Sequence, residues 1–236
     1  MNPSTHAGDN YQVIEIPEPS TEIRTEFARL PLDRFAGGEQ RYRRFSQYRI
    51  TWDEAADAWA LELLEHRPFL QSPEVNSYVG GVQRDFEPLR IDPTAQIDAG
   101  AKALGLDAGD AWQINVHQCR VVANAEVRGV SVPEGPHRDG HEFGMLAVFA
   151  RENIDGGENQ LIPTGGGEPF FTVTLQPNQA LVYDDAAMWH HATDIVPRDD
   201  SGGHRDLWIV AFNRWANRKY GPDFERAATA TGEGRR

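Results

Sequence analysis

His137 and Asp139 stand two positions apart in the segment Pro133–Gly140, which reads PEGPHRDG. In an extended segment, side chains two positions apart point to the same side, so an imidazole and a carboxylate can converge on one ion. Two imidazoles and one carboxylate on one face of an octahedron form the facial triad that binds non-heme Fe(II) and leaves other coordination positions open. The second imidazole must come from another strand, and His190, which follows a β-prone run, is our candidate.

A His-x-Asp pair by itself is a weak signal, because the chain has eight histidines and a histidine on a strand is commonly a structural hydrogen-bonding group. Arg205 strengthens the metal interpretation. It opens an apolar run, and a guanidinium at the mouth of a barrel is suited to bidentate capture of a carboxylate.

Two interpretations of other classes remain open. His137 and His141, four positions apart, would suit a zinc hydrolase if they lay on a helix. Pro136 and Gly140 oppose a helix there. Alternatively, the histidines only pack, and the chain is a non-catalytic, cupin-like binding module.

The second half of the chain predicts the scaffold for these residues. Gly, Pro, Asn and Asp clusters separate five short β-prone runs: Trp112–Val122, Phe143–Ala150, Phe170–Leu175, Gln179–Tyr183 and Leu207–Phe212. Many short strands at such spacing favour a sandwich or a barrel. We therefore predict a mostly β protein with a double-stranded β-helix core (a cupin-like jelly roll) over residues 111–216, braced by N-terminal helices.

The first half, residues 11–110, mixes strands and helices. Gln12–Ile16 alternates and predicts a short strand. Thr51–Glu54 forms a capping box, and the apolar residues after it recur at helical spacing, which predicts a helix over 52–65. Asp92 and Pro93 predict a second helix that ends near Gly105. Residues 11–216 then form a single domain between a disordered N-terminus, residues 1–10, and a C-terminal tail, residues 217–236, with a frayed end from residue 225 onwards.

The composition excludes several partners. With 23 Lys+Arg against 36 Asp+Glu, the 236-residue chain carries a net charge of −13, an acidic field that repels nucleic acid. No segment approaches the roughly 20 apolar residues of a membrane-spanning helix. The first ten residues lack a secretion signal, and Cys119 is the only cysteine, so no disulfide can form within the chain. We expect a cytoplasmic monomer or homodimer with no nucleic-acid or membrane partner.

Several stretches together resemble one family. They are Arg41–Phe45 (RYRRF), Tyr78–Leu89 (YVGGVQRDFEPL), Pro133–Gly140 (PEGPHRDG), Arg151–Glu158 (RENIDGGE), Tyr183–Thr193 (YDDAAMWHHAT) and His204–Asp206 (HRD). In these stretches the sequence resembles the Fe(II)/2-oxoglutarate-dependent dioxygenases. More narrowly, it resembles the branch that contains bacterial isoleucine dioxygenase and related free amino-acid hydroxylases. The resemblance covers most of residues 11–216.

This resemblance implies that His137, Asp139 and His190 bind Fe(II), with 2-oxoglutarate and O2 as co-substrates. Arg205 would hold the distal carboxylate of 2-oxoglutarate. His191 stands where this branch has Gly, and the two adjacent histidines cannot serve together because they point to opposite faces of a strand. The Trp-His pattern of the branch favours His190. Asp139 favours oxygenation, since related halogenases replace this carboxylate with a small residue.

The implied reaction is oxidation of an aliphatic C–H bond of a free amino acid or close derivative, coupled to decarboxylation of 2-oxoglutarate to succinate. Hydroxylation is our first expectation, and ring closure (cyclopropanation) or desaturation of a modified amino acid in natural-product biosynthesis is the alternative. Such a substrate needs a cation for its carboxylate and an anion for its ammonium group. Our candidates are Arg120 and Arg44 for the carboxylate, and Glu126, Asp184 and Asp185 for the ammonium. Asp184 and Asp185, like Glu134, lie near the ligands in sequence and could instead orient an imidazole.

Overall fold

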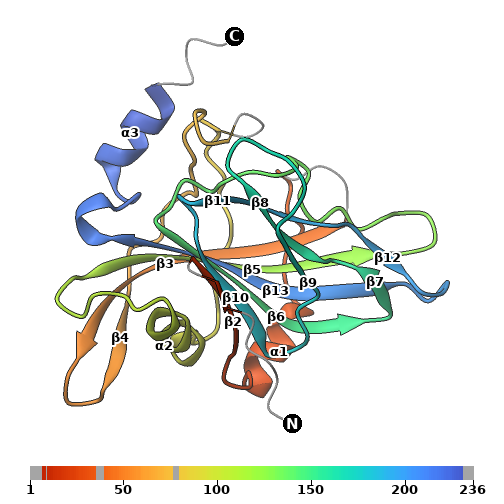
Figure 1. Ribbon diagram of the computed structural model, residues 1–236, viewed down its shortest axis with the longest axis horizontal. Coiled ribbons are helices and arrows are strands. Elements are labelled where there is room, and N and C mark those ends of the chain that lie inside the picture. Colours follow the sequence, from red (N-terminus) through yellow and green to blue (C-terminus); the bar gives the residue numbers. More distant parts are fainter. Residues whose placement is uncertain (1–6, 9, 36–39, 77–79, 231–236) are drawn as a thin grey trace.

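A large antiparallel sheet forms the framework of the protein (Figure 1). The computed structural model describes residues 7–8, 10–35, 40–76 and 80–230. The strand order is β1-β2-β10-β6-β13-β5-β3-β4. The strands are β1 (Ala7–Gly8), β2 (Tyr11–Glu15), β3 (Arg41–Asp53), β4 (Ala58–Leu63), β5 (Trp112–Ala123), β6 (Phe143–Glu152), β10 (Gln179–Asp184) and β13 (Gly203–Arg214).

Two smaller sheets complete the β structure. One contains β11 (Met188–Ala192), β8 (Asn159–Pro163) and β9 (Phe171–Val173), and the other pairs β12 (Ile195–Pro197) with β7 (Ile154–Gly156). Figure 1 shows β8 and β11 on one side of the large sheet and the helices α1 (Thr21–Phe27) and α2 (Thr94–Ala103) on the other. The predicted mostly β jelly-roll architecture with N-terminal helices against it is confirmed.

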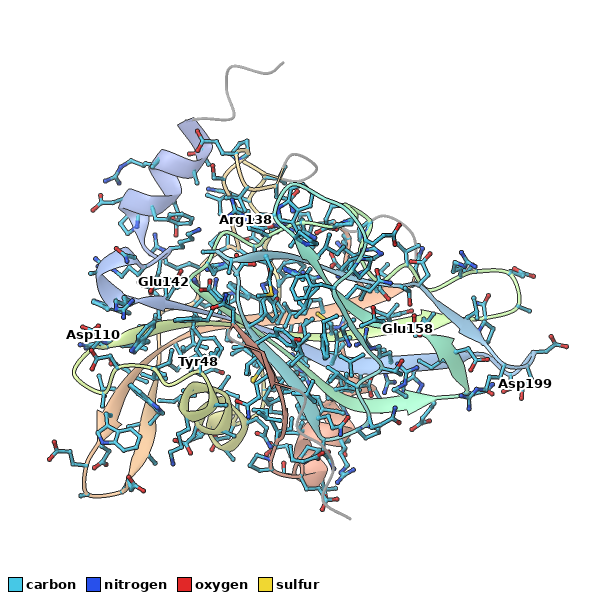
Figure 2. The ribbon with its side chains drawn as sticks, in the orientation of Figure 1. Tyr48, Asp110, Arg138, Glu142, Glu158 and Asp199 are labelled. Atoms are coloured by element: carbon cyan, nitrogen blue, oxygen red, sulfur yellow. The ribbon has the colours of Figure 1, made fainter. Side chains whose placement is uncertain are left out.

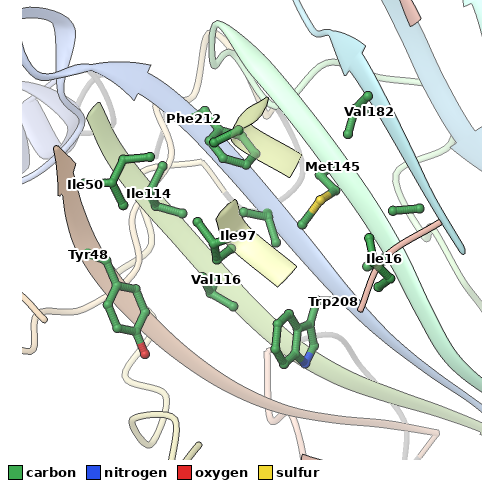
Figure 3. Packing of buried hydrophobic residues seen from close by; sticks show 14 of the residues in the cluster. Ile16, Tyr48, Ile50, Ile97, Ile114, Val116, Met145, Val182, Trp208 and Phe212 are labelled. Carbon is green, nitrogen blue, oxygen red and sulfur yellow. The ribbon is translucent and has the colours of Figure 1, made fainter. Parts of the chain in front are cut away.

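Strand alternation divides the buried residues between the two faces of the large sheet. On β13, Trp208, Val210 and Phe212 pack in the main core with Ile97 of α2. Figure 3 shows Ile97 of α2 against the face of the sheet that carries Val116, Trp208 and Met145. The intervening residues of β13, such as Leu207 and Ile209, face the other side. One face of the sheet therefore makes the main core, and the other packs in smaller hydrophobic clusters and lines a cavity.

The predicted helix over 52–65 is wrong. This stretch is a hairpin in which β3 runs through Asp53 and β4 begins at Ala58. Trp52 and Trp59 are direct cross-strand partners with rings 5.4 Å apart, and Trp59 is buried. Asp53 accepts hydrogen bonds from the backbone N–H groups of Ala55 and Ala56 and so closes a turn, where the sequence had suggested a helix cap. Pairing with β5 outweighs the local helical pattern.

The remaining secondary-structure predictions agree with the structure, except at the chain ends. The second predicted helix is α2, and the β-prone runs correspond to β2, β5, β6, β9, β10 and β13. In the predicted N-terminal disorder, residues 7–8 form β1, while residues 1–6 and 9 lie outside the described residues.

The C-terminal end also differs from the prediction. Pro222–Ala230 forms helix α3 after a short 3₁₀ turn, Trp215–Asn217, in a stretch expected to be partly frayed. Residues 231–236 lie outside the description. None of the helices in the described ranges is long and apolar enough to cross a bilayer.

Candidate active site

The loop between β5 and β6 carries two of the predicted ligands and is fastened to β11. His137 and His190 exchange backbone hydrogen bonds, with N···O distances of 3.1 and 2.8 Å, and form an antiparallel bridge. Residues directly opposite each other in such a bridge place their side chains on the same face. The two imidazole rings accordingly lie 4.4 Å apart between centroids.

Asp139 joins the two imidazoles. Its carboxylate oxygens lie 3.5 Å from Nε2 of His137 and 3.6 Å from Nε2 of His190. One ligand atom from each of the three residues lies within 4.8 Å of the others. Two imidazoles and one carboxylate are the donor set of the facial triad, so the residues fit a non-heme ferrous ion. The structure brings together the three residues predicted from sequence, and the histidine is His190 rather than its neighbour His191.

Hydrogen bonds outside the triad set its orientation. The Nδ1 atom of His137 lies 2.9 Å from the carbonyl oxygen of Gly135 and can donate to it, which leaves Nε2, the nitrogen on the side of Asp139, for a metal ion. The buried Asp185 carboxylate accepts backbone hydrogen bonds from Asp139, Gly140 and His141 at 2.7 to 3.0 Å. Asp185 thus holds the ligand loop in place. Arg138, which lies on the same loop and is labelled in Figure 2, is on the side of the large sheet away from α2.

Electrostatics within the triad favour a bound cation. Burial disfavours the charged forms of both Asp139 and His137, but their mutual attraction is stronger in sum. It lowers the pKa of Asp139 well below its usual range and, together with Glu134, raises the pKa of His137 to about 9. A carboxylate that stays ionised in a buried site is well suited to a metal ion.

Arg205 lies on the same cavity face, in β13, with 1% of its surface exposed. Its Nη2 donates to Oδ1 of Asn159 at 3.1 Å, while its Nε atom is buried without a hydrogen-bond partner. Among the described residues no acidic side chain forms an ion pair with it. Burial, and then the nearby Arg151 cation, lower the pKa of Arg205 to about 9. A buried cation with a free donor fits an anionic ligand, such as the distal carboxylate of 2-oxoglutarate.

One cavity connects these groups. The triad lines it together with Arg205 and Asn159. A second group of arginines, Arg41, Arg43 and Arg84, also lines it. The apolar part of the wall comes mainly from the cavity face of the large sheet, at Leu146, Leu207 and Ile209. The arrangement allows a metal-bound co-substrate and an apolar group of a second molecule to lie side by side along this wall.

The structure does not bring Arg44 or Arg120 to this cavity. Both lie on the other face of the large sheet, because side chains alternate along a strand. Arg44 is buried and forms an ion pair with Glu26 of α1. Arg120 makes a two-pronged ion pair with Asp206, with both distances 2.7 Å. Each arginine is therefore neutralised by a partner outside the cavity.

The predicted acidic residues also lie outside the cavity lining. Glu126 is exposed in the loop after β5. Asp184 closes a turn by accepting hydrogen bonds from the backbone N–H groups of Ala186 and Ala187. Asp185 supports the ligand loop through the backbone N–H groups of that loop. Its Oδ1 atom lies 3.5 Å from Nδ1 of His190, the kind of imidazole that its alternative role would orient.

Sequence reasoning missed the cavity residues Arg41, Arg43, Arg84 and Asn159. The RYRRF stretch contains a usable signal, because on one strand Arg41 and Arg43 must share a face that Arg44 does not. Arg84 lies within the family-like stretch Tyr78–Leu89 and Asn159 directly follows Arg151–Glu158, but no spacing in either stretch marks these two residues. His141, the partner of His137 in the zinc-hydrolase alternative, is no part of the triad and lies with its Nδ1 2.7 Å from the amide nitrogen of Asn213.

Comparisons with known proteins agree with this site. The 2OG-Fe dioxygenase family matches residues 24–211. The chain is similar to a crystal structure of a bsmA homolog from Methylobium petroleophilum PM1, with 28% identity, a TM-score of 0.68, and coverage of 81% of this chain and 79% of that one. It is also similar in fold to IDO from Bacillus thuringiensis, with 21% identity, a TM-score of 0.68, and coverage of 87% and 94%.

A third similar structure is the Fe(II)/(alpha)ketoglutarate-dependent dioxygenase TqaL, with 15% identity and a TM-score of 0.55 over 87% of this chain and 83% of that chain. At this identity the likeness concerns the fold alone. The sequence matches no curated protein.

Proposed function

The chain belongs to the 2OG-Fe dioxygenase family, and we propose that it oxidises an aliphatic C–H bond of a free amino acid or a close derivative, in the first instance by hydroxylation. The observation that carries the proposal is the convergence, in one cavity, of the His137–Asp139–His190 triad and the buried, unpaired Arg205. The family uses Fe(II), 2-oxoglutarate and O2. Family membership also decides against the zinc hydrolase and the non-catalytic binding module.

Each residue has a role that follows from its contacts. His137, Asp139 and His190 would hold the ferrous ion, and Arg205 would bind the distal carboxylate of 2-oxoglutarate, with Asn159 fixing the guanidinium. Bound iron supplies the activation of dioxygen that couples decarboxylation of 2-oxoglutarate to oxidation of the substrate. Leu146, Leu207 and Ile209 would exclude water from the reacting carbon.

An amino-acid substrate is supported by the character of the cavity. It combines an apolar wall with a cationic region that is separate from Arg205, so it suits a small molecule with one anionic end and an aliphatic part. Asp139 occupies the third ligand position, which supports oxygenation over halogenation. The single cysteine, Cys119, is free and buried, which is compatible with the cytoplasmic location we propose.

The test is an assay with Fe(II), 2-oxoglutarate, O2 and a panel of aliphatic L-amino acids, analysed for succinate and by mass spectrometry. We expect succinate to form together with a product that has gained one oxygen atom. A product that has lost two hydrogens would assign ring closure or desaturation instead. Succinate formation that no panel member stimulates would contradict the amino-acid proposal, and His137→Ala provides the inactive control.

A further inference from the structure

The cavity contains a second cationic region that the metal and 2-oxoglutarate do not account for. Arg41 and Arg43 of β3 and Arg84 of the loop before α2 all line it. They are buried, with exposed fractions of 8%, 8% and 6%. The Nε atoms of Arg41 and Arg84 are buried without a hydrogen-bond partner, and the Nε atom of Arg43 lies 3.2 Å from a carboxylate oxygen of Asp33. Three buried arginines with one paired acid in one cavity require an explanation, because a buried cation is costly unless it is paired.

The protein fixes these arginines in place and neutralises only one of them. Asp33 forms an ion pair with Arg43 at 3.2 Å, and the guanidinium of Arg43 lies 5.3 Å from the ring centre of Phe86. Arg84 lies 4.5 Å from the ring centre of Phe69 and donates to Oε1 of Gln71 at 2.7 Å. Stacking uses the flat face of a guanidinium and leaves N–H groups in its plane for a ligand.

The charge balance of this region favours an anion. Among the described residues, Asp33 is the one acid in an ion pair with any of the three arginines, and Arg41 forms no ion pair. Burial, and next the Arg43 cation, lower the pKa of Arg41, and the same two causes lower the pKa of Arg84 to about 10. A carboxylate bound among these groups would supply the missing charge.

The position differs from that of Arg205. Arg41 and Arg205 are both paired with Val121, from the two strands that flank β5. They therefore lie two strand spacings apart, about 10 Å between Cα atoms. A 2-oxoglutarate molecule that is held by Arg205 and reaches the triad leaves the second group of arginines available for another anion.

Glu134 supplies the opposite charge in the same cavity. It lies in the ligand loop and lines the cavity, and its carboxylate is 3.7 Å from Nε2 of His137. This Nε2 atom also faces Asp139 and is the atom that would coordinate a metal ion. In the metal-loaded protein, Glu134 would then be free to bind another cation.

We propose that Arg41, Arg43 and Arg84 bind the carboxylate of the substrate and that Glu134 binds its ammonium group, an inference that rests on the proposed amino-acid oxygenase function. The substrate is then recognised as a zwitterion. Its aliphatic part would lie against the apolar wall formed by Leu146, Leu207 and Ile209. Specificity for a free α-amino acid comes from these four residues, and specificity for the co-substrate comes from Arg205.

The test measures binding, so it does not depend on turnover. The full-length protein, loaded with Mn(II) and saturating 2-oxoglutarate, is titrated calorimetrically with L-leucine, L-isoleucine and L-norleucine. For the tightest binder, the methyl ester is then compared, along with the amine and the carboxylic acid that lack one charged group. We expect at least one amino acid to bind, with the ester and the amine weaker by about tenfold or more.

Variants assign the two charges. Arg41→Gln and Arg84→Gln should each weaken amino-acid binding by about 10- to 100-fold while the affinity for 2-oxoglutarate changes less than about threefold. Arg41→Lys should restore part of the loss, and Arg90→Gln, at an exposed position, is the matched control. Glu134→Gln should weaken binding of the amino acid but leave the carboxylic acid analogue unaffected.

Several outcomes overturn the inference. One is wild-type amino-acid affinity in both Arg41→Gln and Arg84→Gln. Another is an equal loss of 2-oxoglutarate affinity, which would assign these arginines to the co-substrate site. A protein that binds 2-oxoglutarate but none of the amino acids also refutes it. If 2-oxoglutarate itself fails to bind the Mn(II)-loaded wild type, the proposed function fails as a whole.

Discussion

The carboxylate of Asp185 accepts a hydrogen bond from the backbone N–H of Asp139 at 3.0 Å, so a buried acid from the turn after β10 holds a metal ligand on a distant loop. The same carboxylate accepts from the next two N–H groups of that loop, at Gly140 and His141. The two carboxylate oxygens of Asp185 therefore accept three backbone hydrogen bonds. The position of Asp139 depends on a residue that would not itself touch the metal.

Asp185→Asn should weaken metal binding by about 10- to 100-fold, the range for loss of an outer-shell contact. An amide has one carbonyl oxygen, and its NH2 group would face a backbone N–H in place of an acceptor. The measurement is a titration of the apoprotein with Mn(II), followed by electron paramagnetic resonance. Asp184→Asn, which alters the neighbouring turn acid, is the control and should bind metal as the wild type does. Equal affinities in both variants would show that the loop is held by other contacts.

Arg205→Ala should raise the apparent KM for 2-oxoglutarate by about 100-fold or more, because it removes the buried cation that would pair with the distal carboxylate. The KM for the amino-acid substrate should change far less. Steady-state succinate formation, followed at varied 2-oxoglutarate and then at varied amino-acid concentrations, gives the two KM values. Arg198→Gln, an exposed arginine paired with Asp155, serves as the control. An unchanged 2-oxoglutarate requirement would show that the anchor lies elsewhere in the cavity.

The sequence predicts the triad well because two of its members are local. His137 and Asp139 fall in one short extended segment, where spacing alone fixes the relative direction of the side chains. The pairing of His137 with His190 is long-range. It depends on the strand register that the fold imposes, and the resemblance to a family, rather than the spacing, singled out His190.

The substrate residues could not be predicted in the same way. Arg41, Arg43 and Arg44 are of one type, and because β3 is buried on both faces, burial does not tell which of them reach the cavity. The register of β3 with β5 places Arg41 opposite Val121 and Arg43 opposite Cys119, both on the cavity face. No local pattern in the sequence reports which face of a doubly buried strand meets a cavity.

The β3–β4 hairpin gives a further test, since the helical pattern around Trp59 was misleading. Trp59 has 2% of its surface exposed and packs with Trp52 across the hairpin. Trp59→Ala should lower the free energy of unfolding by about 3 to 5 kcal/mol, as for other buried aromatic deletions. Leu63→Ala, at an exposed position on the same strand, should change it by about 0.5 kcal/mol or less. Urea unfolding measures the change in free energy for each variant. Similar changes for the two variants would argue against the packing of Trp59 in the hairpin.

His117 makes the stability of the protein depend on pH. It is buried in the cavity wall, with its ring 4.5 Å from Phe45 and 4.4 Å from Phe69. Burial, and next the Arg43 and Arg84 cations, lower the pKa of His117 well below its ordinary value of 6.5. Below pH 6.5 the unfolded chain therefore binds a proton that the folded chain does not, so stability is full above this pH and falls as the pH drops.

His117→Phe keeps an aromatic ring in the Phe45 and Phe69 contacts and removes this titration. Between pH 7 and pH 5 the wild type should lose more free energy of unfolding than the variant, by up to about 2 kcal/mol, which is what 1.5 pH units below the pKa of the unfolded histidine correspond to. Urea unfolding at both pH values gives the difference, in which the other titrating groups cancel. Parallel pH profiles for the two proteins would mean that His117 takes up its proton in the folded state, and that the cavity tolerates a further cation beside Arg43 and Arg84.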